Sequence, residues 1–291
     1  MSNISLGSTL LSLGSRYLRG LAVTVALAAG ASTSMQAQEV KVAAPHQHAP
    51  VSILRTHDDQ TWDSTNWSGY AVTGTNAQSV SASWTVPAAN CQHGPAQYSS
   101  FWIGIDGWSS GTVEQIGTDS DCSSGRPVYY AWYEFYPQPS FYAGNLTNLQ
   151  PGDEMTATVT YAGSIFTATI KDGRSGASYK TTFTPSTPAS RSSVEWIAEA
   201  PSSGNRILPL ADFGTVGFSK CQATIEVAGG TSAVSGDIGS FLPGNTSVSN
   251  SANVQMSTMV SDGKKPVPMA TPTVLNPAGS DFSVTWDSSG P

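Results

Sequence analysis

Charge is scarce in this sequence. Only 11% of its 291 residues are Asp, Glu, Lys or Arg, and 20 acidic residues outnumber 13 basic ones, which gives a formal net charge of −7. Nucleic acids and anionic membranes are bound through clusters of basic residues. The composition therefore argues against both as partners.

Long apolar runs are also lacking, and none approaches the roughly 18 residues of a membrane helix. The longest run, GLAVTVALAAGA at 20–31, follows Arg16 and Arg19 and leads into small residues, with possible cleavage after Ala31 or Ala37. This order is typical of a secretory signal peptide, and a membrane anchor is the alternative. We expect residues 1–37 to be a signal peptide and the mature protein to be secreted.

Histidine and the common catalytic motifs are sparse. His46, His48 and His57 precede the first convincing strand, and His93 lies in a turn-like stretch. The sequence has no G-x-S-x-G, H-E-x-x-H or Walker motif, and no His or Cys cluster with metal-ligand spacing. We expect no metal and no cofactor, and a hydrolase of this sequence would have to work with carboxylates and amides.

Three cysteines are present, which leaves three possible pairings. An exported protein can form a disulfide. Cys91 and Cys122 flank the same pair of expected strands, so we favour a bridge between them, with Cys221 as a buried thiol.

What the sequence has in abundance is short alternation of apolar and polar residues. Examples are SVSASWTVP (79–87), EMTATVTYAGSIFTATIKDG (154–173) and DFSVTW (281–286), separated by Gly, Ser, Pro and Asn. This pattern predicts an all-β sandwich or barrel. We expect one domain over residues 61–291, preceded by an arm or short pro-segment at 38–60.

Several strands carry an unusual second face. In FWIGIDGW (101–108), TVEQIGTD (112–119), YYAWYEFYP (129–137) and RSSVEWIAEAP (191–201), aromatic and acidic side chains or Gln alternate with an apolar face. Large rings suit a groove better than a solvated sheet surface. Taken together, these strands predict a cleft for an extended polymer, whereas each one alone would fit an ordinary surface strand.

These stretches, with NWSGYAV (66–72), VSASWTVP (80–87), PGD (151–153) and LADFGTVGFS (210–219), occur in the order seen in the glutamic peptidases, or eqolisins. The chain resembles a bacterial-type member of that family over about residues 64–288. The resemblance implies a sandwich of two large antiparallel sheets, concanavalin- or lectin-like, with one sheet bent to form a substrate groove. It also implies an acid endopeptidase.

The resemblance further assigns roles to individual residues. A glutamate–glutamine dyad falls on Glu199 and Gln115, and Glu195 becomes a supporting acid. The remaining residues expected to line or support the groove are Trp67, Trp102, Asp106, Asp119, Trp132, Glu134 and Tyr136. The implied partners are protein or peptide substrates, and we expect a monomer.

Only a short stretch separates the expected signal peptide from the domain, and its Lys41, Arg55 and three histidines could neutralise an acidic groove as a pro-segment.

The alternative function is a carbohydrate-binding or carbohydrate-hydrolysing sandwich, with Glu134 and Glu199 as its acid pair. That alternative gives Gln115 no special role.

Overall fold

The structure is a computed structural model that describes residues 41–57, 61–74, 76–91, 95–144, 146, 148–226, 233–242 and 253–290. The expected signal peptide at 1–37 and His93 lie outside these residues. Within them, no helix is long and apolar enough to cross a membrane.

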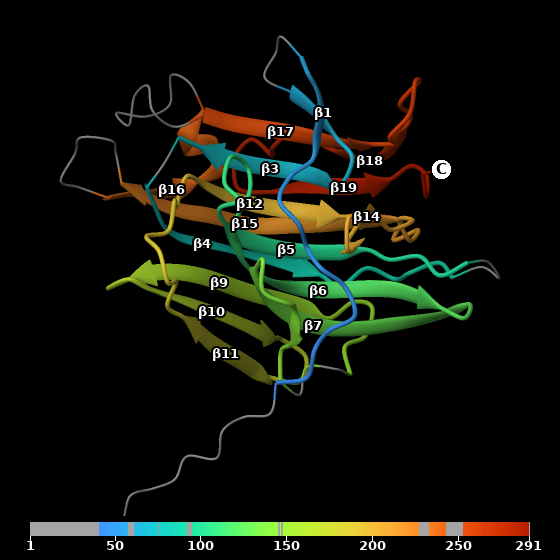
Figure 1. The fold of residues 1–291 in the computed structure, drawn as a ribbon, viewed down its shortest axis with the longest axis horizontal. Helices are drawn as coiled ribbons and strands as arrows, with labels where there is room; N and C mark the ends of the chain where they lie inside the picture. Colours follow the sequence, from blue (N-terminus) through green and yellow to red (C-terminus); the bar gives the residue numbers. More distant parts are fainter. Residues whose placement is uncertain are drawn as a thin grey trace, which may run out of the picture. The chain divides into compact units, whose positions relative to one another are not determined.

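Strands dominate the described chain and form two layers (Figure 1). Neighbouring strands of the first layer are, in spatial order, β1 (Ile53–Thr56), β2 (Thr61–Ser64), β17 (Asn253–Val260), β3 (Trp67–Thr73), β12 (Ser193–Glu199), β5 (Ser100–Ile105), β6 (Val113–Ser123), β7 (Arg126–Tyr136) and β8 (Phe141–Tyr142). All of these pairings are antiparallel except that of β17 with β2.

The second layer is antiparallel throughout. Its order is β18 (Pro268–Pro272), β19 (Phe282–Trp286), β15 (Thr215–Glu226), β4 (Asn76–Thr85), β9 (Glu154–Ala162), β10 (Ile165–Asp172) and β11 (Ser178–Phe183). β16 (Ala233–Asp237) pairs with the end of β15, and β17 pairs with β18, which joins the layers. The short elements are β13 (Ser202–Ser203), β14 (Arg206–Ile207) and the 3₁₀ helix η1 (Ile238–Phe241).

The main core lies between the layers and confirms the predicted alternation. On β12, Val194, Trp196 and Ala198 point into this core, whereas Ile197 packs on the opposite face with Trp102. Each successive strand side chain points to the opposite face of a sheet. The all-β sandwich with an aromatic and acidic second face is therefore confirmed, and we call this second face of β12, β5, β6 and β7 the outer face.

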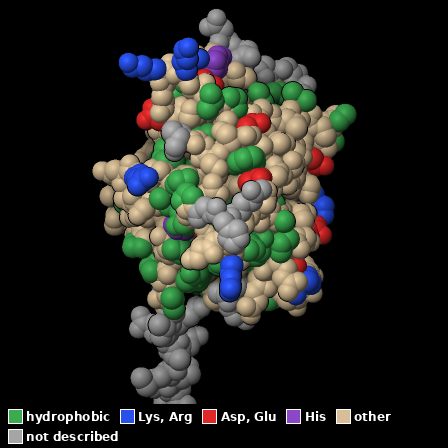
Figure 2. All heavy atoms as spheres, turned by 90° about the vertical axis from the view of Figure 1, so that its right-hand side faces the viewer, with side chains coloured by type: hydrophobic (Ala, Val, Ile, Leu, Met, Phe, Trp, Pro, Cys, Tyr) green, Lys and Arg blue, Asp and Glu red, His purple; other side chains and the backbone are tan. Residues whose placement is uncertain are grey.

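The predicted cysteine pattern is also confirmed. Cys91 and Cys122 form a disulfide, and Cys221 is a buried free thiol. The surface shown in Figure 2 carries scattered charged side chains of both signs and no broad patch of one sign. This distribution agrees with the low content of charged residues.

The chain before β1 crosses the outer face. Residues 41–52, the blue coil that passes in front of β5, β6 and β7 in Figure 1, are held there by backbone hydrogen bonds. Gln47 forms an isolated antiparallel bridge with Ser202, and the amide of Val51 donates to the carbonyl of Gly107 at 3.1 Å. We call residues 41–52 the covering segment.

Candidate active site

Strand register gathers the predicted site residues on the outer face. Pairing of β12, β5, β6 and β7 produces three adjacent rows across the sheet, each with one residue from every strand. The rows are Glu195–Gly104–Gln115–Glu134, Ile197–Trp102–Gly117–Trp132 and Glu199–Ser100–Asp119–Tyr130. Paired residues of antiparallel strands share a face, so acids, an amide and aromatic rings from four strands meet on one surface.

Glycine at position 117 makes room for this arrangement. A Cβ there would lie 2.5 Å from both the carbonyl oxygen of Phe101 and the Cβ of Trp102. Only a residue without a side chain lets β5 and β6 approach so closely. Gly117 thereby leaves room for the Trp102 side chain in the middle one of the three rows.

Glu199 is fixed by that tryptophan. The Nε1–H of Trp102 donates to Oε2 of Glu199 at 2.7 Å, while Oε1 has no hydrogen-bond partner among the described residues. Burial raises the pKa of Glu199 well above its usual range, and the positive charge of His48 opposes that rise. A carboxylate with a raised pKa is a stronger base than an exposed glutamate.

Gln115 holds a backbone carbonyl of the covering segment. Its Nε2 donates to the carbonyl oxygen of His48 at 2.6 Å and to Oε2 of Glu134 at 3.2 Å. Its Oε1 is buried without a partner within the described part of the chain. No hydrogen bond joins Gln115 to Glu199 in that part of the chain.

The sequence offers His48 only as one of five residues that could neutralise the groove and assigns it no place in the site. Its ring stacks on Trp132 with centroids 3.4 Å apart and an interplanar angle of 3°. Nδ1 lies 3.2 Å from Oε2 of Glu134, and Nε2 lies 3.1 Å from Oγ of Ser100 and 3.6 Å from Oδ1 of Asp119. The backbone N–H of His48 also donates to Glu134 at 2.7 Å. Both ring nitrogens therefore face acceptors.

Electrostatics favour a charged imidazolium at this position. Burial alone would lower the pKa of His48, but Asp119 and Glu134 raise it to about 10. Burial acts to raise the pKa of Asp119, and His48 outweighs this so that the pKa is lowered. For Glu134 burial prevails, and its pKa is raised despite His48.

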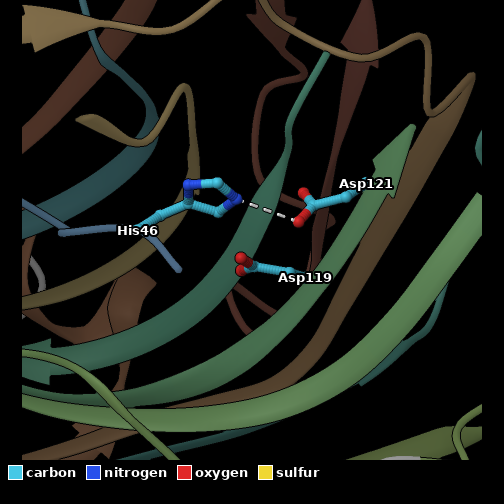
Figure 3. Close-up of side chains that lie close together, drawn as sticks. All are labelled: His46, Asp119 and Asp121. Atoms are coloured by element: carbon cyan, nitrogen blue, oxygen red, sulfur yellow. Dashed lines mark hydrogen bonds and ion pairs between the residues drawn. The ribbon is translucent and has the colours of Figure 1, made fainter. Parts of the chain in front are cut away.

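A second histidine meets the neighbouring acids (Figure 3). Nε2 of His46 lies 3.2 Å from Oδ2 of Asp121, and the hydroxyl of Tyr130 lies 2.8 Å from Asp119 and 2.9 Å from Asp121. Burial, with the charge of Asp119, raises the pKa of Asp121 to about 6. One oxygen or nitrogen from each of His46, Asp119 and Asp121 lies within 4.8 Å of the others, a spacing that a metal could use. Both carboxylates already accept hydrogen bonds from protein side chains. Tyr130 donates to each of them, and Trp132 also donates to Asp119 at 2.6 Å.

Two of the remaining predicted residues support the site without touching His48. Asp106 accepts hydrogen bonds from the backbone amides of Arg191 and Ser192, at 2.7 and 2.8 Å, and thereby fixes the chain just before β12. Trp67 donates from Nε1 to the carbonyl of Ala49 at 3.1 Å and packs edge-on against Trp102.

The last two predicted residues differ in burial. Tyr136 is half-buried at the end of β7 and packs against the aromatic cluster of the outer face. Glu195 is fully buried on that face, and burial raises its pKa well above the usual range.

The predicted neutralisation of the acids needs correction. Lys41 lies over the Tyr133 and Phe141 rings, and Arg55 pairs with Asp63 at 3.7 Å, so neither reaches the buried carboxylates. Only His46 and His48 do so. The i, i+2 spacing of His46 and His48 indicates in the sequence that they act together, because it places both rings on one side of an extended segment.

Comparison with known proteins adds the remaining information. The profile of the Peptidase A4 family matches residues 65–263. The chain is similar to Aspergillopepsin-2 from Aspergillus niger, at 28% identity over 235 residues, covering 70% of this chain and 83% of that protein. It is also similar to Scytalidopepsin B from Scytalidium lignicola, at 31% identity over 175 residues, covering 55% of this chain and 64% of that protein.

A solved structure has the same fold. The crystal structure of scytalido-glutamic peptidase with a transition state analog inhibitor matches with a TM-score of 0.59 and 23% identity, covering 77% of this chain and 98% of that one. The family match spans well over half of the present chain and includes all four strands of the outer face. The chain therefore belongs to the Peptidase A4 family and is an eqolisin-type glutamic peptidase, an acid endopeptidase.

Proposed function

We propose that the chain hydrolyses peptide bonds through Glu199 and Gln115. The observation that carries this proposal is the hydrogen bond from Nε2 of Gln115 to the carbonyl oxygen of His48 at 2.6 Å. The side-chain amide of Gln115 thus already binds a peptide carbonyl of an extended segment. The proposal assigns the same contact to the carbonyl of a substrate.

The chemistry divides between the two side chains. The Glu199 carboxylate takes a proton from water, which attacks the carbonyl carbon, and the resulting carboxylic acid protonates the departing nitrogen. Gln115 cannot titrate, and its N–H stabilises the oxyanion of the tetrahedral intermediate. An acid–base residue contributes about 10²–10⁴ in rate and one oxyanion donor about 10²–10³.

Two substitutions test the assignment. Glu199→Gln and Gln115→Ala should each reduce kcat on a denatured protein, assayed at the acidic pH where the wild type is most active, by at least about 10². Thermal unfolding of each variant should stay close to that of the wild type. Turnover near the wild-type rate in either variant contradicts the dyad.

A matched control lies on the same strand and face. Glu195→Gln makes the same chemical change four residues before Glu199, at a position that does not contact the covering segment through any hydrogen bond between described residues. We expect a smaller loss of kcat. If Glu195→Gln is as damaging as Glu199→Gln, the roles of the two acids are reversed.

We also propose that the protein is secreted. Support comes from the apolar stretch at 20–31 behind Arg16 and Arg19, and from the Cys91–Cys122 disulfide, a bond typical of exported proteins. Expression of the full sequence should place the protein, shortened by 31 or 37 residues, outside the cytoplasm. Retention of residues 1–37 on a cell-associated product would contradict this.

A further inference from the structure

A cavity of about 400 Å³ lies where three parts of the chain meet. It is lined by residues 110–112 before β6, by Glu114 of β6, by residues 135–138 at the end of β7, and by residues from the stretch 183–190 between β11 and β12. None of the described residues of the covering segment lines it. The cavity is therefore separate from the surface that the covering segment occupies.

Glu114 brings a buried carboxyl group to this cavity. It pairs with Ile105 and Phe135, whose side chains lie in the main core, so its own side chain points to the same side of the sheet. The residue is only 2% exposed, and its Oε2 has no hydrogen-bond partner among the described residues. Buried polar atoms are nearly always hydrogen-bonded, so an unpartnered oxygen in a cavity wall indicates a ligand that carries a donor.

The charges around the cavity select the kind of ligand. Burial raises the pKa of Glu114 to about 8, and the charge of Asp106 adds to this rise. Burial also raises the pKa of Glu195 well above its usual range, and the charges of Asp106 and Glu114 contribute. Within the described lining of the cavity, no residue is Lys, Arg or His. Three acids that raise one another's pKa, beside a cavity wall without a basic residue, favour a cation over an anion.

The walls suit a cation that is carried on an apolar chain. The rings of Phe135 and Phe183 stack with centroids 4.8 Å apart, and Pro185 and Pro188 also line the cavity. Such surfaces can cover the methylene groups of a lysine side chain while its ammonium group reaches a carboxylate. A guanidinium is a poorer match, because it binds best to two acceptors at once, and only one oxygen of Glu114 lacks a partner within the described chain.

We infer that this cavity binds a lysine side chain of a peptide that lies on the outer face, with the ammonium group on Oε2 of Glu114. Tyr136 provides the link between the two places, because it lines the cavity and also packs in the aromatic cluster of the outer face. Only the choice of a peptide as the carrier of the lysine rests on the proposed function. The ion pair itself needs neither Glu199 nor Gln115, so it can be tested without turnover.

The test measures binding of N-acetyl-lysine N-methylamide to the full chain at pH 8. The methyl resonances of Thr112, Thr187 and Ala189, which line the cavity, should shift in NMR spectra as this probe is added. N-acetyl-norleucine N-methylamide has a similar side chain without the charge. It should bind at least about tenfold more weakly, since a charge-assisted hydrogen bond is lost. No shift with the lysine probe, or equal binding of the two probes, overturns the inference.

Two variants test the role of Glu114. Glu114→Gln keeps the shape of the side chain without its charge and should bind the lysine probe at least about tenfold more weakly. Glu154→Gln, the same change at an exposed position outside the cavity, should match the wild type. Ser186→Lys adds an ammonium group to the cavity wall from an exposed position and should compete with the probe. Wild-type affinity in Glu114→Gln overturns the inference.

Affinity for the lysine probe should also rise with pH. The pKa of Glu114 is about 8, so its carboxylate forms only as the pH approaches that value, whereas the lysine ammonium persists to a pKa of about 10.4. The affinity should therefore increase about tenfold or more from pH 6 to pH 8. The other titratable groups near Glu114 are Asp106 after β5, Glu195 of β12 and Tyr136 of β7. A constant affinity over this range overturns the inference.

A third probe, n-butylamine, separates a peptide from a free amine. Binding of n-butylamine without binding of the lysine probe overturns the assignment to a peptide. The results also separate the inference from the proposed function. A chain that binds the lysine probe but cuts no added protein at acidic pH contradicts the proposed function alone. A chain that cuts added protein but does not bind the probe contradicts the inference alone.

Discussion

Both faces of β5, β6, β7 and β12 are largely buried, and they are chemically opposite. The inner face presents apolar residues such as Ile103 and Trp196 to the second layer, whereas the outer face buries Gln115, Glu134 and Glu199. Apolar burial stabilises the fold, while a buried carboxylate opposes it unless partners compensate. The inner face is covered by a permanent sheet and the outer face partly by a segment of the chain's own N-terminus, so only the second kind of burial can be undone without unfolding.

Neighbouring residues of β12 provide the largest test of this contrast. Trp196 is fully buried in the core and donates to the carbonyl of Ser81 at 2.9 Å. Trp196→Ala should lower the free energy of unfolding by about 3–5 kcal/mol. Denaturant titration measures this change.

The matched change is Glu195→Gln, one residue earlier and on the outer face. Burial raises the pKa of Glu195, so its ionised form opposes folding above the usual pKa. Removing that ionisation should leave the unfolding free energy at neutral pH unchanged or higher. A loss comparable to that of Trp196→Ala would show that the faces do not differ as described.

Gly117 provides the next largest effect. In Gly117→Ala the new Cβ would meet the carbonyl oxygen of Phe101 at 2.5 Å, and β5 and β6 would have to separate. Overpacking of this kind costs about 1–3 kcal/mol. Gly111→Ala is the control, because a Cβ there meets nothing within 4 Å. Equal thermal stability of the two variants would contradict the tight approach at Gly117.

Local pattern was enough to predict the two faces. Strand side chains alternate with a period of two, so FWIGIDGW and YYAWYEFYP display their apolar and polar faces in the sequence itself. The Cys91–Cys122 bridge followed from the same strand assignment. The resemblance to glutamic peptidases added the expected roles of Gln115 and Glu199, which remain proposals.

The docking of the covering segment could not be predicted in this way. His46 and His48 lie more than 70 residues from their partners Asp121 and Glu134 in the sequence. No periodicity within residues 41–52 indicates which surface they cover. Their position before the first strand allowed either an arm or a pro-segment that neutralises the groove, and only the assembled sheet brings acceptors to both rings.

A smaller effect is expected for the pH dependence of this docking. The pKa of His48 is raised from 6.5 to about 10, so its ion pairs stabilise docking fully below pH 6.5 and are lost as the pH rises toward 10. The pKa of Asp119 is lowered from 3.8, so its contribution is present above pH 3.8 and is lost as the pH falls further. Docking of residues 41–48 should therefore weaken at both extremes.

Other titratable groups near His48 affect how docking of the covering segment changes as the pH falls. The titratable groups that act on it or on its partners are His46, Asp119, Asp121, Tyr130, Glu134 and Glu199. The pKa of Glu134 is raised, so on acidification Glu134 is protonated before Asp119. Because a raised pKa means that protonation of Glu134 does not oppose docking, release in acid should follow protonation of Asp119.

Tryptophan fluorescence can follow this release in the Glu199→Gln chain, because the ring of His48 stacks on Trp132. The chain has eight tryptophans, so a chain that also carries His48→Ala supplies the background. The difference between the two should be largest between pH 3.8 and pH 6.5 and vanish in strong acid. A difference that does not change with pH would contradict the role of the carboxylates.

The smallest effect should come from the exposed start of the covering segment. Lys41 is solvent-exposed, and its Nζ lies 5.8 Å from the Tyr133 ring centroid and 5.6 Å from that of Phe141. Exposed cation–π contacts are weak, so Lys41→Ala should speed release of residues 41–48 by only about two- to fivefold. Lys41→Arg, which keeps the cation, should match the wild type. If Lys41→Ala releases the segment as readily as His48→Ala, docking depends on the exposed end rather than on the buried imidazolium.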